Sequence, residues 1–357
     1  MAQTRTGVRP PFSANELAVD GTSARARPTS PGRALHYYAR LLAASTLILV
    51  AAGGMVTSTN SGLAVPDWPT TYGHNMFTFP LQDMVGGIFY EHGHRLIAST
   101  VGFLTIGLVA WLWISEPRAW VRKLGWIALG VVILQGTLGG LTVLFFLPDA
   151  ISISHAGLAQ IFFCLTISLA LFTSRGWKFP GAKRDRVAFY EKRKKRPGPF
   201  LEAPSNDTTL QRRLIWLTGL VYVQILLGAT MRHTGAGLAI PDFPLMFGGL
   251  LPPSWTAPIA IHFAHRMGAV VVTIWAIVAI AHVLRQHRHR PELTRPAWLL
   301  AAAITAQVTL GAFVVLTGKQ PVINTLHVAT GALVLGTSLL LTLRAHRARF
   351  AMPAVTS

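Results

Sequence analysis

The chain has 357 residues, of which 51% are hydrophobic and only 13% are charged, with a formal net charge of +19. An average soluble protein carries about 25% charged residues, so this composition excludes a soluble fold. The single cysteine, Cys164, excludes an internal disulfide and a cysteine-based zinc or iron–sulfur site within one chain. Because Cys164 lies in an apolar stretch, we interpret it as a small buried side chain.

The first 34 residues contain Pro, Ser, Thr and Arg without an apolar core, which predicts a disordered tail and not a signal peptide. Eight apolar stretches then approach the roughly 20 residues that a helix needs to cross a bilayer. None alternates with period two, as barrel strands do. We expect membrane-spanning helices near Tyr37–Val56, His92–Ile114, Leu124–Phe145, Ile151–Phe172, Leu214–Met231, Ile261–Leu284, Ala297–Leu316 and Val322–Leu343.

The basic residues are distributed unevenly between the two sides of these spans. Of the 32 Lys and Arg, 28 lie in the N-terminal region up to Arg40, in the connectors after the second, fourth and sixth spans, and at the C-terminal end. Only Arg232 and Lys319 lie in connectors on the other side. The positive-inside rule therefore predicts a multi-pass protein of the inner (plasma) membrane with both termini in the cytoplasm. The charge is a topology signal, so we expect membrane lipid and no nucleic acid as a partner.

The two halves of the chain match each other position by position. Gly62–Pro69 (GLAVPDWP) matches Gly237–Pro244 (GLAIPDFP) at an offset of 175, and Gln135–Gly140 (QGTLGG) matches Gln307–Ala312 (QVTLGA) at an offset of 172. Four spans per half insert both halves the same way up, as in a parallel repeat. The sequence predicts an all-α membrane protein with eight transmembrane helices in two tandem four-helix bundles.

The predicted division of the chain follows from this repeat. We expect a cytoplasmic tail over 1–34, an N-terminal bundle over 35–174, a basic cytoplasmic linker over 175–213, a C-terminal bundle over 214–345 and a cytoplasmic tail over 346–357.

Four histidines lie near the beginning of even-numbered spans: His94 and His155 in the first half, His265 and His327 in the second. Their spacings agree, and helices two and four lie diagonally across an up-down bundle, so each pair can face the core at similar depth. Two facing imidazoles in an apolar bundle are typical of axial ligation of a haem iron. By contrast, we expect interface positions for the histidines that lie among arginines at helix ends, namely His282, His287, His289 and His346.

Glu91 lies three residues before His94 and shares its helix face, whereas the second half has His262 at the corresponding position. Two interpretations remain open for this acid: stabilisation by the helix dipole in a first turn, or proton transfer beside a haem ligand. Arg95 and Arg266 each follow a ligand candidate, and either propionate contacts or helix packing fits them.

Aspartates occupy the repeated Pro-Asp-aromatic-Pro stretches of the two halves. These are Asp67 and Asp242. Asp side chains readily accept hydrogen bonds from nearby backbone N–H groups in turns. We therefore expect a turn-forming role for both.

Three motifs together resemble the haem A synthase family of bacteria and mitochondria: Gly62–Pro69, Glu91–Arg95 (EHGHR) and His262–Arg266 (HFAHR). The resemblance covers roughly residues 35 to 345. It implies a membrane oxidoreductase that oxidises the C8 methyl group of haem O to the formyl group of haem A, by successive hydroxylations through a hydrated aldehyde. One departure is that Val65 to Tyr72 lacks the cysteine pair of some members, which excludes a redox role for that loop.

The resemblance also implies residue roles. Glu91 matches the catalytic glutamate, His94 and His155 match the histidines for the substrate haem O, and His265 and His327 match the ligands of a haem b cofactor. Haem O would be delivered by a haem O synthase, electrons would come from a donor such as quinol, and the product would serve cytochrome oxidase assembly.

A different class of protein fits the histidines equally well. A di-haem b-type cytochrome that transfers electrons without modifying haem also needs two histidine pairs, and only Glu91 and the family motifs favour the enzyme. A transporter has little support, because no pair of spans is broken by Gly or Pro at mid-membrane.

Overall fold

A computed structural model describes residues 31–178 and 207–347. Residues 1–30 of the tail predicted over 1–34, residues 179–206 of the linker predicted over 175–213, and the last ten residues lie outside the described residues. Residues 31–34 and 208–213 are helical, so the tail and the linker end earlier than expected.

The described residues are almost entirely helical, with eight long helices. They are α1 (Pro31–Ser58), α2 (Gly86–Ser115), α3 (Ala119–Leu144), α4 (Asp149–Thr173), α7 (Thr208–His233), α8 (Ala257–Gln286), α9 (Pro291–Leu316) and α10 (Pro321–Ala345). Each is long and apolar enough to cross a membrane, by length and composition. The predicted all-α fold with eight spanning helices is therefore confirmed. Short elements complete the described chain: α5 (Arg175–Lys178), η1 (Leu81–Asp83) and η2 (Ala236–Leu238).

Six of the eight long helices begin four to six residues before the apolar stretches that predicted them, and α4 and α10 begin one or two residues before. The second helix begins at Gly86 and the sixth at Ala257, although their apolar stretches were expected from residues 92 and 261. The first turns combine apolar residues with glycine in α2 (Gly86–Tyr90) and with proline in α8 (Ala257–Ala260), so hydropathy alone did not mark where these helices begin. The histidines of these helices therefore lie deeper in the helix than the sequence suggested.

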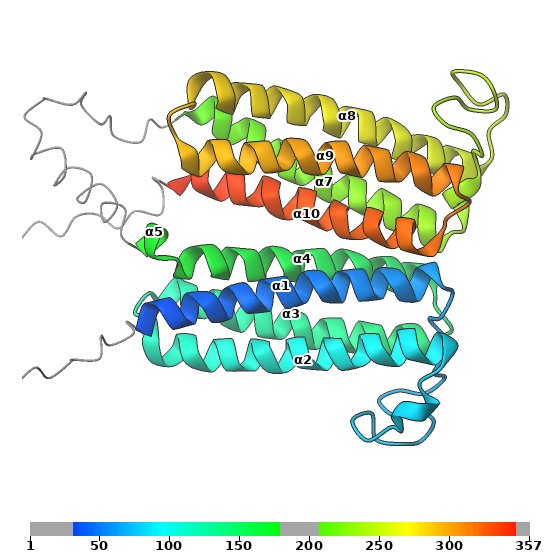
Figure 1. The fold of residues 1–357 in the computed structure, drawn as a ribbon, viewed down its shortest axis with the longest axis horizontal. Helices are drawn as coiled ribbons and strands as arrows, with labels where there is room; N and C mark the ends of the chain where they lie inside the picture. Colours follow the sequence, from blue (N-terminus) through cyan, green and yellow to red (C-terminus); the bar gives the residue numbers. More distant parts are fainter. Residues whose placement is uncertain (1–30, 179–206, 348–357) are drawn as a thin grey trace, which may run out of the picture. The chain divides into compact units, whose positions relative to one another are not determined.

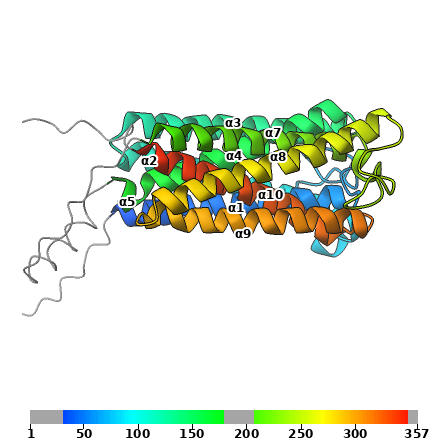
Figure 2. The ribbon, with the colours of Figure 1, turned by 90° about the horizontal axis from the view of Figure 1, so that it is seen from above.

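The helices form two groups in Figure 1: α1 to α4 pack with one another, and so do α7 to α10. Figure 2 shows the same helices running nearly parallel to a common direction. Each group has its own buried apolar core, which stabilises it because apolar side chains are removed from solvent. Leu42, Leu108 and Leu169 belong to the first core, and Leu214 and Leu300 to the second.

Small residues bring the two groups into contact, where α1 and α4 pack against α7 and α10. A Cβ on Gly336 would lie 2.5 Å from Cδ1 of Ile167, so the glycine lets α10 approach α4 without displacing that side chain. Polar contacts add to the packing, because Arg232 donates to the carbonyl of Gly54 at 2.8 Å and to the hydroxyl of Ser58 at 2.6 Å.

All eight helices alternate between two ends of the structure. The long loops 59–85 and 234–256 lie at one end, here called the loop end. The beginning of α1, the short helix α5 and the end of α10 lie at the opposite end, here called the linker end. The histidines of interest lie in the loop-end halves of α2, α4, α8 and α10.

Candidate functional site

A tight turn in the first loop is closed by Asp67. Its carboxylate accepts hydrogen bonds from the N–H of Tyr72 at 2.7 Å, the N–H of Gly73 at 2.9 Å and the hydroxyl of Thr70. Burial would raise the pKa of Asp67, but the hydrogen bonds from Gly73, Thr70 and Tyr72 outweigh it and lower the pKa.

The second loop contains the same turn, closed by Asp242. Its carboxylate accepts from the N–H groups of Phe247 and Gly248, both at 2.8 Å. The hydrogen bonds from Gly248 and Phe247 lower the pKa of Asp242. The predicted turn-forming role of both aspartates is confirmed.

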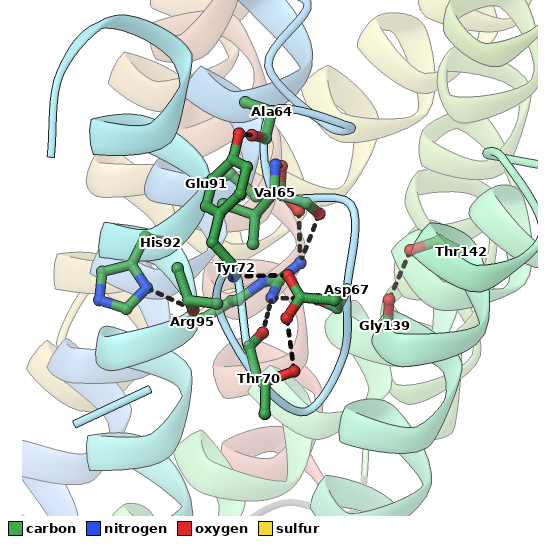
Figure 3. A network of polar contacts seen from close by, with 11 residues as sticks. Ala64, Val65, Asp67, Thr70, Tyr72, Glu91, His92, Arg95, Gly139 and Thr142 are labelled. Carbon is green, nitrogen blue, oxygen red and sulfur yellow. Dashed lines mark hydrogen bonds and ion pairs between the residues drawn. The ribbon is translucent and has the colours of Figure 1, made fainter. Parts of the chain in front are cut away.

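Arg95 of α2 holds the first turn against the helices, as Figure 3 shows. Its guanidinium donates to the carbonyls of Asp67 at 2.7 Å, Thr70 at 3.0 Å and Val65 at 3.1 Å, and to the carboxylate of Glu91 at 2.7 Å. An arginine has five N–H donors, so these contacts leave the Nε–H. The main observed role of Arg95 is to fix the loop.

Glu91 is buried, with 4% of its surface exposed, and both carboxylate oxygens are engaged. Oε2 accepts the N–H of Val65 at 2.8 Å, and Oε1 forms the ion pair with Arg95 at 2.7 Å. Because α2 begins at Gly86, Glu91 lies in the second turn. The interpretation by a first-turn helix dipole was therefore wrong, since that effect is confined to the end of a helix.

The second loop is held in a parallel way by α8. Arg266 donates to the carbonyls of Ile240 at 3.1 Å, Asp242 at 2.7 Å and Leu245 at 3.0 Å. His262, at the position of Glu91, receives the N–H of Ile240 at Nδ1 and the Nε–H of Arg266 at Nε2, both at 3.2 Å.

The two anchors differ in what they can accept. A carboxylate accepts both the backbone N–H and the guanidinium at once, whereas a neutral imidazole has one acceptor nitrogen. His262 can therefore satisfy only one of its two donors at a time. The second half keeps the loop anchor but lacks an ionisable acid at this place.

The structure brings the four candidate histidines together in two pairs. His94 lies close enough to His155 for the rings to interact electrostatically, and His265 is placed likewise to His327. All four are partly buried. The members of each pair come from two different helices of one four-helix group.

A glycine on a neighbouring helix faces each of these rings. A Cβ on the glycine would lie about 3 Å from the ring atom Cε1, closer than real Cβ atoms normally approach. The pairs and distances are Gly53 with His94 at 3.0 Å, Gly139 with His155 at 3.1 Å, Gly228 with His265 at 2.9 Å, and Gly311 with His327 at 3.0 Å. The glycines therefore leave the space that the imidazoles need.

Glutamines contact three of the four histidines, each four residues before the facing glycine. The amide nitrogen Nε2 lies 3.3 Å from Nε2 of His155, 3.1 Å from Nδ1 of His265 and 3.3 Å from Nε2 of His327; the glutamines are Gln135, Gln224 and Gln307 respectively. Sequence reasoning missed this role. The available signal was the spacing Gln-x-x-x-Gly, which occurs once in each of α3, α7 and α9.

Several buried polar atoms of this region have no hydrogen-bond partner. They include Nδ1 of His94 and His155 and Oε1 of the three glutamines, Gln135, Gln224 and Gln307. Buried polar groups almost always have partners, so these atoms are free to bind something further. Paired imidazoles, glycine-lined rings and apolar helices together fit axial ligation of a haem iron in each half.

A third group of side chains lies at the linker end. Nε2 of His282 lies 2.8 Å and Nε2 of His287 lies 2.9 Å from the same carboxylate oxygen of Asp207. Both histidines are buried, so the expectation that they lie at the membrane interface was wrong. In the described part of the chain, this is the group of three His, Cys, Asp or Glu residues with metal-ligand spacing.

Its hydrogen bonds argue against a metal at the linker end. Nη1 of Arg213 lies 2.7 Å from Nδ1 of His282, so this nitrogen must accept and the ring proton must lie on Nε2. His282 then has no lone pair left for a metal. Burial would raise the pKa of Asp207, but hydrogen bonds from Leu210 and the two histidines outweigh it and lower the pKa to about 2.

Eight helices long and apolar enough to cross a membrane, in two groups that each carry two histidines faced by glycines, define a multi-pass membrane protein. The chain belongs to the family of cytochrome oxidase assembly proteins (COX15-CtaA), which matches residues 36–339. The predicted resemblance is confirmed.

Several similar proteins are named haem A synthase. The haem A synthase of Symbiobacterium thermophilum is 30% identical over 74% of this chain and 80% of its own length. That of Halalkalibacterium halodurans is 26% identical over 83% of this chain and 91% of its own length. That of Chelativorans sp. is 27% identical over 81% and 84% respectively.

Proposed function

We propose that this chain is a haem A synthase, a membrane oxidoreductase that converts a methyl group of haem O into the formyl group of haem A. The observation that carries the proposal is the family match over residues 36–339, together with relatives named haem A synthase. The histidine pair in each half and the buried acid in one half support it.

The residue roles follow the two halves. His94 and His155 are proposed to bind the substrate haem O, and His265 and His327 to bind haem b. Nδ1 of His327 lies 3.2 Å from the backbone carbonyl of Gln307 and can donate to it. Nε2 would then bind iron in place of its 3.3 Å contact with the side-chain amide of Gln307. When bound, haem b would supply one-electron transfer.

Glu91 is the proposed catalytic residue because it is the buried acid one turn from His94. Its carboxylate is held by Val65 and Arg95, so it is fixed in place and can take up or release a proton at Oε1 or Oε2. For Arg95 and Arg266 we propose loop anchoring as the main role, with the N–H groups left over after that anchoring available to a haem propionate.

We infer the orientation from the basic residues. The linker end would face the cytoplasm, and the loops 59–85 and 234–256 would face the outside, in the inner membrane. Haem O would come from a haem O synthase, and a donor such as quinol would supply electrons. A reporter fused after Arg196 should be active in the cytoplasm only; activity in the periplasm would overturn the orientation.

The experiment for the function is co-expression with a haem O synthase in a host without haem A, followed by pigment extraction and mass analysis. Haem A or its hydroxylated precursor is the expected result. If the membranes contain only unchanged haem O, and the protein purified from them carries haem b, the chain is a di-haem cytochrome without haem-modifying activity.

A further inference from the structure

Gln224 of α7 contacts His265 of α8 at two points. Its amide nitrogen lies 3.1 Å from the ring nitrogen Nδ1 and donates to the backbone carbonyl of the same residue at 2.7 Å. Gly268 provides the room for this side chain, since a Cβ there would overlap Oε1 of Gln224. The amide is therefore seated between the ring and the backbone of α8.

The equivalent positions in the first half are apolar. The offset of 175 places Leu49 at the position of Gln224, and the offset of 171 that relates His94 to His265 places Ile97 at the position of Gly268. A leucine neither donates nor accepts a hydrogen bond. Accordingly Nδ1 of His94, which is shielded from solvent, has no partner.

The other two histidines resemble His265 and not His94. Gln135 donates to the backbone carbonyl of His155 at 2.9 Å, and its amide nitrogen also lies near the ring. Gln307 contacts the ring of His327 with its side-chain amide nitrogen and with its backbone carbonyl. Three of the four candidate ligands are therefore tied to a neighbouring helix through a glutamine, and His94 is the exception.

We propose that Gln224 is a positioning residue that locks the His265 ring, and that Leu49 and Ile97 leave the His94 ring free to turn away. The inference rests on the proposed function only in taking these histidines as haem ligands. A ligating histidine donates its other ring N–H to an acceptor, which fixes the ring and strengthens ligation. The acceptor of Gln224 is Oε1, which has no other partner. When the amide turns over, Oε1 takes the Nδ1 proton of His265 and leaves Nε2 for iron. A small external ligand should consequently compete with His94 more easily than with His265.

The test uses the purified, reduced holoprotein and carbon monoxide as the probe, read by difference spectroscopy. One amide–imidazole hydrogen bond is worth a factor of about two to ten in ring occupancy. Gln224→Leu should raise the affinity of the C-terminal haem for carbon monoxide by that factor. Gly268→Ala should act in the same direction. The added Cβ would push the amide of Gln224 away from the ring, although the chain still carries the glutamine.

The reciprocal change introduces the glutamine–histidine contact into the first half. Leu49→Gln with Ile97→Gly should weaken carbon monoxide binding to the N-terminal haem by about two- to tenfold. Gly219→Ala on α7 is the matched control, because a Cβ there meets nothing within 4 Å, and it should leave binding unchanged.

Unaltered carbon monoxide binding in haem-loaded Gly268→Ala and in the Leu49/Ile97 double variant would overturn the inference. If Gln224→Leu loses its haem, Gly268→Ala decides, since it removes no polar group. Failure of the proposed function is recognised separately, by the absence of haem A from the pigment extract. The carbon monoxide measurements depend only on the iron ligands and still give an answer in that case.

Discussion

The two halves of the molecule hold their loops and their histidines with different side chains. In the first half a carboxylate, Glu91, joins the loop backbone to Arg95, and Leu49 occupies the sequence position that corresponds to Gln224. In the second half an imidazole, His262, takes the loop-anchoring position, and Gln224 holds the ring of His265.

These differences occur on a frame that otherwise agrees closely. Both halves have the aspartate-closed turn, the arginine that binds loop carbonyls and the glycine that faces each ring. A buried acid and a histidine without a glutamine contact coincide in one half, and a non-acidic anchor and a glutamine-bound histidine coincide in the other. Under the proposed function, the first combination suits chemistry on a substrate and the second suits permanent binding.

Removing a ligand should have the largest effect and should separate the halves completely. His265→Ala or His327→Ala is expected to strip the resident haem b from the purified protein, because iron loses an axial ligand. His94→Ala or His155→Ala should leave haem b bound and abolish haem A formation. Haem content by absorbance and product by mass analysis check this; loss of haem b from the first-half variants alone would reverse the assignment.

Exchanging the loop anchors tests whether the acid matters for chemistry. Glu91→His copies the second half, so the loop keeps an anchor while the carboxylate is removed. We expect haem A formation to fall by about 100-fold or more, the usual contribution of a general acid or base, with haem b content unchanged. Wild-type product levels in this variant would make Glu91 a purely structural residue.

Two further variants complete that exchange. His262→Glu places a carboxylate in the second half and should leave product formation near the wild-type level. Glu91→Gln, nearly isosteric with the wild type, removes the ionisable group and, like Glu91→His, keeps one acceptor for the two donors Val65 and Arg95, so it should lose haem A formation to a similar extent.

Helix number and order followed from the sequence because a bilayer demands long apolar helices. The positions of the four histidines followed from the repeat, since equal spacing in both halves places them at equal depth. Helix ends did not follow, because the first turns contain glycine or proline, such as Gly86 in α2 and Pro258 in α8, which hydropathy alone does not assign to a helix. The amide contacts of Gln135, Gln224 and Gln307 were missed, since they depend on the rotation of neighbouring helices against each other, which no single sequence specifies.

At the linker end, too, a contact between helices could not be predicted from the sequence. His282 and His287 lie among arginines, a pattern typical of interface residues, and yet they are buried against Asp207. Asp207 is far from both in sequence, so only tertiary packing reveals the contact.

Crowding the rings should have an intermediate effect. Gly228→Ala would place a Cβ 2.9 Å from Cε1 of His265 and displace the ring, and overpacking of this kind costs about 1–3 kcal/mol. We expect the retained haem b to decrease, whereas Gly53→Ala, which crowds His94, should lower product and spare haem b. Gly219→Ala is again the control. Equal loss of haem b in the Gly53 and Gly228 variants would contradict separate sites.

The smallest effect is expected at the linker end, where only the second half has an acid at the beginning of its first helix. Asp207 caps α7 through the N–H of Leu210 and binds two histidines, whereas the first half has Gly32 at the matching position. Asp207→Asn retains a good N-cap and removes the charge.

The pKa of Asp207 in the folded protein is about 2, below the roughly 3.9 of an unfolded aspartate. The stabilisation from the Asp207 carboxylate is therefore complete above about pH 4 and is lost as the pH falls through the folded pKa. It is worth roughly 2 kcal/mol at neutral pH.

Thermal unfolding at pH 7 should give Asp207→Asn a Tm a few degrees below that of the wild type, and the difference in Tm should shrink steadily below about pH 4. Asp83→Asn, at an exposed carboxylate of η1, should behave as the wild type throughout. A difference that persists undiminished in acid would mean that Asp207 acts through its shape and not through its charge.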